Sequence, residues 1–326
     1  MIIARSPLRI SIGGGGTDLP SYYTLKGGQF ISASINKYVY VTITKPFAPG
    51  IYLKYSKIEN CNNVEDIKHP IIKECLKLFK LPKPQIEITT LADVPSGTGL
   101  GSSGSFTVAL LKALFAFYGG YVTKHELAEL ACDIEINKLN EPVGKQDQFI
   151  SAIGGVNIFN ISKKGSVKYS PLNISEHELF RFDDNLLLFF TGDTRSASKI
   201  LTHQNKKTQD NDLMMIKNLD ETKKLGNKIK EELLKFNFDN FGRLMNLHWQ
   251  NKIKRSPNMT NNRIKKIYTN ALNNGAIGGK LVGAGGGGFL LFYSDNPNKL
   301  RSFMNSNGVS ELRFNFDFHG VKLITG

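Results

Sequence analysis

The amino-acid sequence predicts an α+β fold of two domains, and three observations support this fold class. The chain has 326 residues, about twice the usual length of one domain. Strand-like and helix-like segments are mixed in both halves. A polar, partly acidic stretch separates the halves between residues 165 and 185. We therefore expect one domain over residues 1–175 and a second over residues 176–326.

The first half is predicted to begin with strands, because its segments are rich in β-branched and aromatic residues. The expected strands are Leu8–Ile12, Phe30–Ile35, Tyr38–Thr44, Ile86–Thr90 and Val156–Ile161. Residues 102–118 predict a long apolar helix that ends at Gly119 and Gly120. Thr123 and Glu126 have the spacing of a capping box, so a second helix is expected to begin there.

The second half predicts a buried strand at Asn185–Thr191 and another at Phe289–Tyr293. The lysine-rich region Lys199–Lys235 is expected to form helices that face solvent. Arg263–Leu272 has apolar residues at helical spacing, which predicts an amphipathic helix that Gly275 closes.

The net charge is strongly positive, since 42 Lys and Arg minus 28 Asp and Glu leave +14. The basic residues are nevertheless spread along the chain and interleaved with acidic ones, as in Lys223–Lys235. No nucleic-acid-binding signature accompanies them, so we expect no nucleic-acid partner. A basic protein that binds small anions fits this composition.

The cysteines and the apolar runs indicate a cytoplasmic protein with no membrane association. Cys61, Cys75 and Cys132 are odd in number and far apart, which argues against a disulfide framework or a zinc site built from cysteines. No apolar run approaches the roughly 18–20 residues that span a bilayer. Arg5 and Pro7 interrupt the stretch that a signal peptide would need.

A Gly/Ser-rich loop, Pro95-Ser-Gly-Thr-Gly-Leu-Gly-Ser-Ser-Gly-Ser105, joins an expected strand to the long helix. Such a loop directs several backbone N–H groups and the positive end of the helix dipole toward one point, which suits a polyphosphate. It lacks the Gly-Lys-Ser/Thr ending of a Walker A motif and the downstream acid of a dinucleotide fold. The expected nucleotide-binding residues here are Pro95, Gly97, Gly99, Leu100, Gly101, Ser102, Ser103 and Gly104.

This loop resembles the P-x-x-x-G-L-G-S-S motif of the GHMP small-molecule kinases. Two further segments resemble the other motifs of that family in the same order: Pro7-Leu-Arg9 followed by Gly13 to Asp18, and Lys280 to Gly288. The resemblance implies a kinase that uses ATP and Mg²⁺. It also implies an N-terminal ribosomal-protein-like α/β domain and a C-terminal ferredoxin-like domain, with Gly285 and Gly286 contributing to the nucleotide site.

A phosphoryl transfer needs a metal ligand and a group that orients the acceptor hydroxyl. Glu135 borders the apolar face of its helix, where an unpaired carboxylate would be costly. The resemblance implies that Glu135 and Ser103 coordinate Mg²⁺, with Ser102 close by. It also implies that Asp147 deprotonates the acceptor hydroxyl and that Arg9 keeps this carboxylate ionised.

The N-terminal motif narrows the expected acceptor to sugars. Arg9 and Thr17-Asp18 agree with the sugar kinases of the family, but Gly15 and Gly16 replace the Glu-His pair of the galactokinases. The segment Gly14 to Pro20, followed by two tyrosines, resembles the kinases that phosphorylate the anomeric hydroxyl of D-glycero-D-manno-heptose 7-phosphate for surface-glycan synthesis. The expected substrate-binding residues are Thr17, Asp18, Lys37, Arg195 and Lys199, with the cations at the phosphate of the acceptor.

Three alternatives remain open from the sequence. The chain could be another sugar kinase of the family, of the fucose or galactose type. It could also be a non-catalytic nucleotide or sugar sensor, although a sensor has no need of Glu135, Asp147 and both loop serines together. A decarboxylase of the same fold fits Arg9 and the Gly-Gly-Gly-Thr-Asp segment poorly. The sequence does not fix the oligomeric state and leaves a homodimer open.

Overall fold

The structure is a computed structural model that describes residues 1–80, 84–192 and 197–325, and the side chains of residues 197–199 are not described. Its larger sheet has the strand order β11-β1-β2-β5-β3-β4, and β6 and β7 extend it from the other end of β2. The strands are β1 (Ile2–Gly13), β2 (Gly28–Thr44), β3 (Ile51–Lys54), β4 (Ile58–Cys61), β5 (Ile86–Ala92), β6 (Val156–Ile161), β7 (Val167–Pro171) and β11 (Lys322–Thr325).

Strand β2 is one continuous strand, whereas the sequence predicted two. Its first part pairs with β6 and its last part pairs with β5, so a single long strand joins both wings of the sheet. The pairing of β2 with β1 shifts register at Asn36 and Lys37, which lie opposite the step from Pro7 to Leu8. A bulge therefore accommodates these two polar residues without a turn, because the segment contains no Gly or Pro to end the strand.

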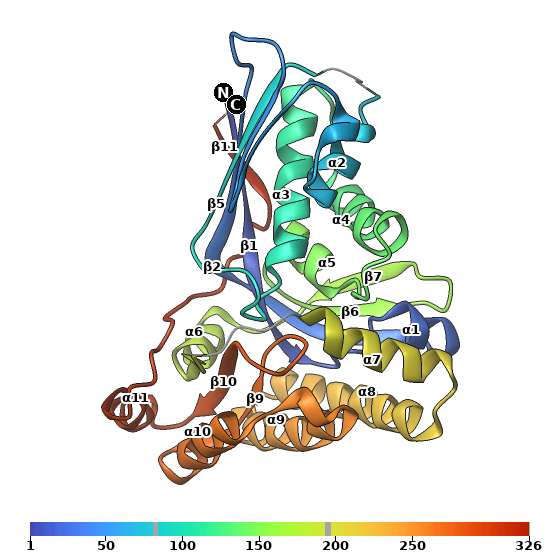
Figure 1. The fold of residues 1–326 in the computed structure, drawn as a ribbon. Helices are drawn as coiled ribbons and strands as arrows, with labels where there is room; N and C mark the ends of the chain where they lie inside the picture. Colours follow the sequence, from blue (N-terminus) through green and yellow to red (C-terminus); the bar gives the residue numbers. More distant parts are fainter. Residues whose placement is uncertain (81–83, 193–196, 326) are drawn as a thin grey trace.

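Helices cover one face of this sheet, as Figure 1 shows. The central one is α3 (Ser102–Phe117), which is apolar along most of its length and packs on β1 and β2. Around it lie α2 (Pro70–Lys77), α4 (Lys124–Cys132), the π-helical turn η2 (Asp133–Lys138), α5 (Gln146–Ile153) and the short η1 (Val64–Asp66). The expected capping box is confirmed, because Thr123 accepts from the Glu126 N–H and Glu126 accepts from the Thr123 N–H.

The second unit has a three-stranded antiparallel sheet in the order β8 (Leu186–Phe190), β10 (Phe289–Ser294), β9 (Ala276–Leu281). Glu311 forms an isolated antiparallel bridge with Phe189 on the free side of β8. When the segment at Glu311 is counted as a fourth strand beside β8, the strand order is that of a ferredoxin-like sheet, as predicted from the sequence. The remaining helical segments are α1 (Pro20–Lys26), α6 (Glu176–Asp184), α7 (Ala197–Gln209), α8 (Leu213–Leu234), α9 (Phe238–Lys252), η3 (Ile253–Arg255), η4 (Pro257–Met259), α10 (Asn262–Asn273) and α11 (Pro297–Ser306).

Helix α8 corrects one expectation, because one of its faces is buried and does not face solvent. Leu225, Ile229 and Leu233 lie in the same apolar cluster as Leu8 and Ile10 of β1. These apolar residues recur at helical spacing among the lysines, and the high lysine content hides that periodicity in the sequence. Contact of α8 with β1 and β2 joins the two units.

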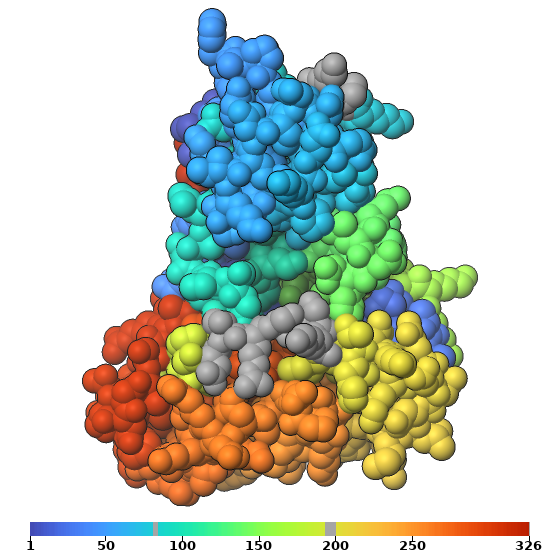
Figure 2. Space-filling model, in the orientation of Figure 1, coloured from blue at the N-terminus to red at the C-terminus, as the bar shows by residue number. Residues whose placement is uncertain are grey.

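The end of the chain returns to the first unit. Strand β11 pairs with β1, and the backbone carbonyl and carboxylate of Asp317 accept from Ser34 and Tyr38 of β2. In the space-filling view of Figure 2, most residues coloured blue to green form the upper body and most coloured yellow to red form the lower one. We keep the division at residue 175 as a proposal, with β11 added to the first unit. Among the described residues, no helix has the length and apolar character to cross a membrane.

Candidate active site

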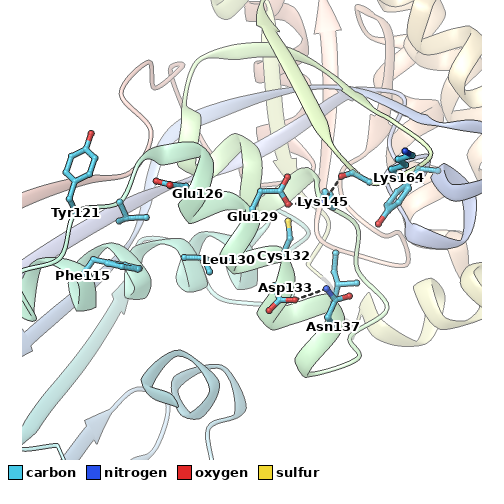
Figure 3. A pocket seen from close by; sticks show the side chains of 14 residues that line it. Phe115, Tyr121, Glu126, Glu129, Leu130, Cys132, Asp133, Asn137, Lys145 and Lys164 are labelled. Carbon is cyan, nitrogen blue, oxygen red and sulfur yellow. Dashed lines mark hydrogen bonds and ion pairs between the residues drawn. The ribbon is translucent and has the colours of Figure 1, made fainter. Parts of the chain in front are cut away.

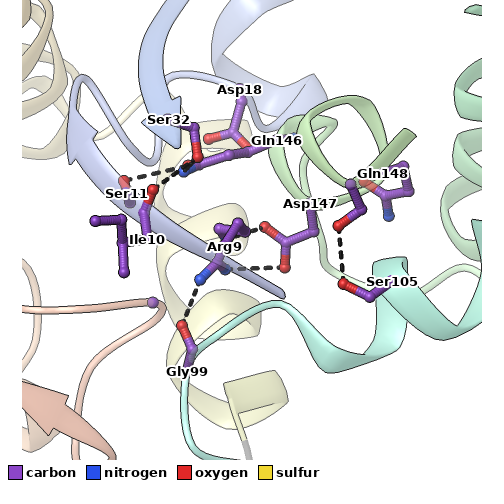
Figure 4. Close-up of polar contacts among 12 residues, drawn as sticks. Arg9, Ile10, Ser11, Asp18, Ser32, Gly99, Ser105, Gln146, Asp147 and Gln148 are labelled. Atoms are coloured by element: carbon purple, nitrogen blue, oxygen red, sulfur yellow. Dashed lines mark hydrogen bonds and ion pairs between the residues drawn. The ribbon is translucent and has the colours of Figure 1, made fainter. Parts of the chain in front are cut away.

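Arg9 and Asp147 form a two-point ion pair where the two units meet. Arg9 lies on β1 and is buried, while Asp147 lies in the first turn of α5 and is partly accessible. The Arg9 Nε and Nη2 groups donate to the two carboxylate oxygens at 2.8 and 2.9 Å (Figure 4). This fork-to-fork geometry fixes the carboxylate in position.

The glycine loop passes directly over this pair. The backbone N–H of Arg9 donates to the carbonyl of Leu100 at 2.9 Å, and Arg9 Nη1 donates to the carbonyl of Gly99. Gly101 caps the start of α3 with a φ of +79°, and a Cβ there would lie 3.0 Å from Arg9 Cγ. Glycine at 101 thus permits both the left-handed turn and the close contact that places the helix N-terminus beside the ion pair.

The C-terminal glycine segment packs against the same loop. A Cβ on Gly283 would lie 2.6 Å from Gly99 Cα, and one on Gly288 would lie 2.1 Å from the Thr98 carbonyl oxygen. Backbone therefore meets backbone between segments about 185 positions apart in the sequence. The two glycine clusters that the sequence singled out separately form one wall.

A cavity of about 640 Å³ opens on one side of this wall. It is lined by five of the expected loop residues, namely Gly97, Gly99, Gly101, Ser102 and Ser103, and by Gly285. Of the other expected residues, Leu100 is fully buried in the core, and Pro95, Gly104 and Gly286 do not line the cavity. Sequence reasoning did not predict the apolar and aromatic side of this cavity, which is formed by Val39, Tyr55, His69, Leu91, Val94 and Phe106.

A second, narrower cavity of about 80 Å³ opens on the other side of the ion pair. Both cavities are lined by Arg9, Asp147, Val143, Leu201, Gly283 and Ala284. Asp147 therefore lies where the cavity of about 640 Å³ (the large cavity) meets the cavity of about 80 Å³ (the small cavity). A group bound in the first cavity could reach a group bound in the second at this point.

Asp18, which the sequence predicts to bind substrate, lines the small cavity and is buried. Its carboxylate accepts from the N–H groups of Gly16 and Gln146 at 2.8 and 3.2 Å. Burial raises the pKa of Asp18 above its usual value, although these two bonds oppose that shift. A Cβ on Gly144 would lie 2.0 Å from the Asp18 carboxylate, so glycine is required there.

The other expected substrate-binding residues differ in position. Thr17 is fully buried, and its hydroxyl lies 2.6 Å from the carbonyl oxygen of Gln29 and 2.9 Å from that of Gly14, so that it can donate to either. We propose that it holds the loop around Asp18. Lys37 is half-buried on β2 and lines neither of these cavities. Arg195 lies outside the described residues, and the side chain of Lys199 does too.

Glu135 and Ser103, the two residues predicted to hold a metal ion, contact each other, and Ser103 lines the large cavity. The Ser103 hydroxyl and the Gln148 amide donate to the two carboxylate oxygens of Glu135. Glu135 is held inward by the π-helical turn η2, and its burial raises its pKa to about 7. The hydroxyl of Ser102 is buried with no hydrogen-bond partner among the described residues.

These oxygen donors suit Mg²⁺, which commonly takes one or two protein oxygens and completes its shell with phosphate and water. No cluster of three or more His, Cys, Asp or Glu side chains suited to a metal occurs in the described part of the chain. The fit therefore rests on the pair Glu135 and Ser103 and on the unpartnered hydroxyl of Ser102.

A third cavity, of about 690 Å³, lies against α4 and shares no lining residue with the other two (Figure 3). Its charged residues include Glu129 and Lys145, which pair with each other at 2.9 Å. It is similar in volume to the cavity beside the glycine wall, yet Arg9, Asp147 and the glycine loop are absent from its lining. We therefore assign the chemistry to the two cavities that meet at Asp147.

The sequence missed a group of buried side chains on the small cavity: His248, Lys252, Arg255 and Lys280. Burial lowers the pKa of Lys280 to about 7 and that of Arg255 to about 10. Lys280 begins the third glycine motif and could have been noticed there. The other three lie among many ordinary polar residues, and only the fold brings them to the cavity.

The N-terminus of α3 and the clamped carboxylate of Asp147 lie together where the two units meet, an arrangement that suits phosphoryl transfer. The sequence matches the GHMP kinases N terminal domain over residues 70–155 and the GHMP kinases C terminal domain over residues 229–310. The chain belongs to the GHMP kinase family, whose members use ATP as the phosphoryl donor.

Similar proteins span nearly the whole chain. D-glycero-alpha-D-manno-heptose 7-phosphate kinase of Campylobacter jejuni is 30% identical, over 98% of this chain and 98% of that protein. L-fucokinase/L-fucose-1-P guanylyltransferase of Bacteroides fragilis is 26% identical over 94% of this chain and 36% of that protein. The crystal structure of a D-glycero-D-manno-heptose 1-phosphate kinase from Bacteroides thetaiotaomicron matches the fold with a TM-score of 0.82, at 24% identity, and covers 100% of this chain and 99% of that chain.

Proposed function

We propose that this protein is an ATP-dependent sugar kinase that phosphorylates the anomeric hydroxyl of D-glycero-D-manno-heptose 7-phosphate to give the 1,7-bisphosphate. The observation that carries the proposal is the position of Asp147, clamped by Arg9 at the junction of a large cavity and a small one. The similarity to the Campylobacter jejuni enzyme over almost the full length supports the choice of acceptor.

ATP occupies the large cavity in this proposal. The adenine ring contacts the apolar side, which includes Val94 and Phe106, and the phosphates lie along the loop from Gly97 to Ser103. Backbone N–H groups at the start of α3 and the positive end of its dipole stabilise the phosphate oxygens. The γ-phosphate then points toward Asp147 and the small cavity.

The acceptor sugar occupies the small cavity, with its anomeric hydroxyl against Asp147. Asp147 takes the hydroxyl proton as the new O–P bond forms, and the bond from the γ-phosphorus to the bridging oxygen breaks to release ADP. Arg9 holds the Asp147 carboxylate in position through two hydrogen bonds and neutralises negative charge on the transferred group. Asp18 accepts hydrogen bonds from ring hydroxyls.

Mg²⁺ fits this scheme at Glu135 and Ser103, with Ser102 as a further oxygen donor. When bound there, the ion neutralises charge on the phosphates and orients them for transfer. Glu135 must be ionised to hold it, and the hydroxyl of Ser103 already points at the carboxylate. We also propose that the enzyme acts in the cytoplasm, where ATP is available.

The test is release of ADP by the purified protein with MgATP and a panel of sugars. The panel contains D-glycero-D-manno-heptose 7-phosphate, the corresponding 1-phosphate, the free heptose, fucose and galactose. We expect turnover with the 7-phosphate, and phosphorus NMR of the product identifies the new phosphate at the anomeric carbon. Turnover with fucose or galactose alone would contradict the proposed acceptor but not the kinase activity. No turnover with any sugar would reject the proposed function.

A further inference from the structure

Three cations on the small cavity are buried without acidic partners. Lys252, Arg255 and Lys280 are 5%, 4% and 1% exposed. None of them forms an ion pair with any residue that the structure describes. Burying an unpaired charge is costly, and proteins normally place a counter-ion or a ligand beside it.

The hydrogen bonds of these side chains go to neutral groups. Arg255 donates to the carbonyl of Gly15 at 3.2 Å and to the side chains of Asn218 and Thr222. Lys280 donates to the carbonyl of Ile12 at 3.2 Å. Lys252 donates to the carbonyls of Leu281 and Gly283.

These carbonyls hold the three cations in place but leave their charge uncompensated. Because an ammonium has three N–H groups and a guanidinium five, each cation keeps at least one N–H that no described residue accepts. The cations are thus prepared to donate to a further, anionic group.

The charges of the side chains that line the small cavity indicate the charge of the anion that would balance them. With both lysines protonated, the four cations (Arg9 and the three above) and the two carboxylates of Asp18 and Asp147 sum to a formal +2. Burial lowers the pKa of Lys252 and Lys280, and an anion bound beside them would favour their protonated forms. His248 is counted as neutral, because burial and the neighbouring cations lower its pKa well below the usual value. A phosphate monoester carries about −1.5 to −2 at neutral pH, which matches this excess.

The guanidinium of Arg255 fits into the small cavity because residue 16 is glycine. A Cβ on Gly16 would lie 2.5 Å from Arg255 Nη1, and Gly16 also has a φ of +101°. A side chain at this position would therefore push the guanidinium out of the cavity. The glycines that replace the Glu-His pair of the galactokinases thus make space for a buried positive charge.

His248 provides an independent indication of a ligand. It is 1% exposed and lines the cavity, and neither of its ring nitrogens has a hydrogen-bond partner among the described residues. A fully buried imidazole without partners is costly unless another molecule supplies them. A phosphate oxygen or hydroxyl in the cavity would satisfy it.

We propose that Lys252, Arg255 and Lys280 form the binding site for the phosphate group that the acceptor sugar already carries before the reaction. This inference rests on the proposed kinase function and deepens it, because it makes a phosphate monoester, and not a neutral sugar, the acceptor class. The γ-phosphate of ATP is the other possible source of this anion. The three cations and His248 line only the small cavity and not the large one, which favours the acceptor.

The kinetic test compares Arg255→Met and Lys280→Met with Lys254→Met, a solvent-exposed lysine of the same segment as Arg255. We expect each cavity variant to raise KM for the heptose 7-phosphate at least about tenfold and to leave KM for ATP within about twofold. Lys254→Met should match the wild type. An equal rise in KM for ATP, or no change in either KM, would overturn the assignment.

A binding test keeps the inference separate from the activity. Calorimetry measures the binding of inorganic phosphate to the wild type, with and without a saturating non-hydrolysable ATP analogue. Binding that persists with the analogue and is lost in Arg255→Met and Lys280→Met supports an acceptor phosphate site, even if every sugar in the panel fails. Phosphate binding that the analogue abolishes assigns the anion to the donor, and absence of binding to the wild type rejects the site.

Variants that do not fold are recognised by their thermal unfolding. In that case Arg255→Lys replaces Arg255→Met, because it keeps the charge and removes only the planar fork. We expect Arg255→Lys to retain phosphate binding with an affinity reduced by about tenfold or less. Unchanged affinity in this variant together with unchanged affinity in Lys280→Met would overturn the proposal.

Discussion

Arg9 and Asp147, which are 138 positions apart in the sequence, hold each other through two parallel hydrogen bonds of 2.8 and 2.9 Å. The same guanidinium also donates to the carbonyl of Gly99 in the glycine loop. One side chain therefore fixes the distance between the proposed base and the proposed phosphate loop. The geometry of phosphoryl transfer depends on this connection.

The Arg9→Lys variant tests whether the fork matters beyond its charge. Lysine keeps the positive charge but cannot make two parallel bonds to Asp147 and a third to Gly99. We expect kcat to fall by about ten- to a hundredfold with the fold retained. The control is Arg5→Lys on the same strand, where the guanidinium stacks on Tyr38 at 4.0 Å and lines neither cavity of the site. Equal kcat values for the two variants would contradict the role of Arg9.

The Glu135→Gln variant tests the metal site. It preserves the shape of the side chain and removes the negative charge, so the Mg²⁺ concentration needed for half-maximal activity should rise about tenfold or more. Titration of activity with Mg²⁺ at fixed ATP measures this value. Asp133→Asn is the control, since Asp133 lies in the same π-helical turn but lines only the third cavity. An unchanged Mg²⁺ requirement in Glu135→Gln would remove Glu135 from the metal site.

The Gly104→Ala variant tests the contact between α3 and α5. A Cβ at position 104 would lie 2.7 Å from Asp147 Cβ and 2.9 Å from the Gln148 backbone nitrogen. The helices must move apart, so we expect kcat to fall at least about tenfold, with a stability loss of about 1–3 kcal/mol. Steady-state kinetics and chemical denaturation measure the two effects. Full activity in this variant would show that the position of Asp147 tolerates displacement.

Stability should depend on pH through Asp183. Burial raises the pKa of Asp183 to about 6, and one of its carboxylate oxygens has no partner among the described residues. The folded state thus binds the proton more tightly than the unfolded state, so ionisation destabilises the fold as pH rises from about 4 to about 6.

Asp183→Asn removes this ionisation and keeps an oxygen that can accept from Asn315. We expect the variant to be more stable than the wild type by about 1 kcal/mol at pH 8, with the difference vanishing near pH 4. Thermal unfolding at both pH values measures it, and Asp210→Asn, at an exposed aspartate directly after α7, is the control. A difference that persists unchanged at pH 4 would exclude ionisation of Asp183 as its cause.

Local signals predicted the elements that carry the site. The capping box at Thr123 and Glu126 and the helix after the glycine loop lie where the sequence indicated. These features depend on neighbours within a few residues, which a sequence displays directly. The convergence of Arg9, Asp147 and the loop was inferred from the order of three motifs, since no local pattern encodes a contact over 138 positions.

Features that depend on packing could not be predicted in the same way. The buried face of α8 was hidden by its lysines, and the continuity of β2 depends on its pairing with both β5 and β6. Lys252, Arg255 and Lys280 resemble many exposed cations of this basic chain. Only their burial beside one cavity distinguishes them.

The turnover number of Asp147→Asn tests the central claim most directly. Asparagine keeps the size of the side chain and a bond to Arg9, but it cannot take the proton of the acceptor hydroxyl. With MgATP and D-glycero-D-manno-heptose 7-phosphate, we predict that kcat falls at least about a hundredfold while ATP affinity and thermal stability stay near the wild-type values. A variant that turns over at close to the wild-type rate would contradict the account.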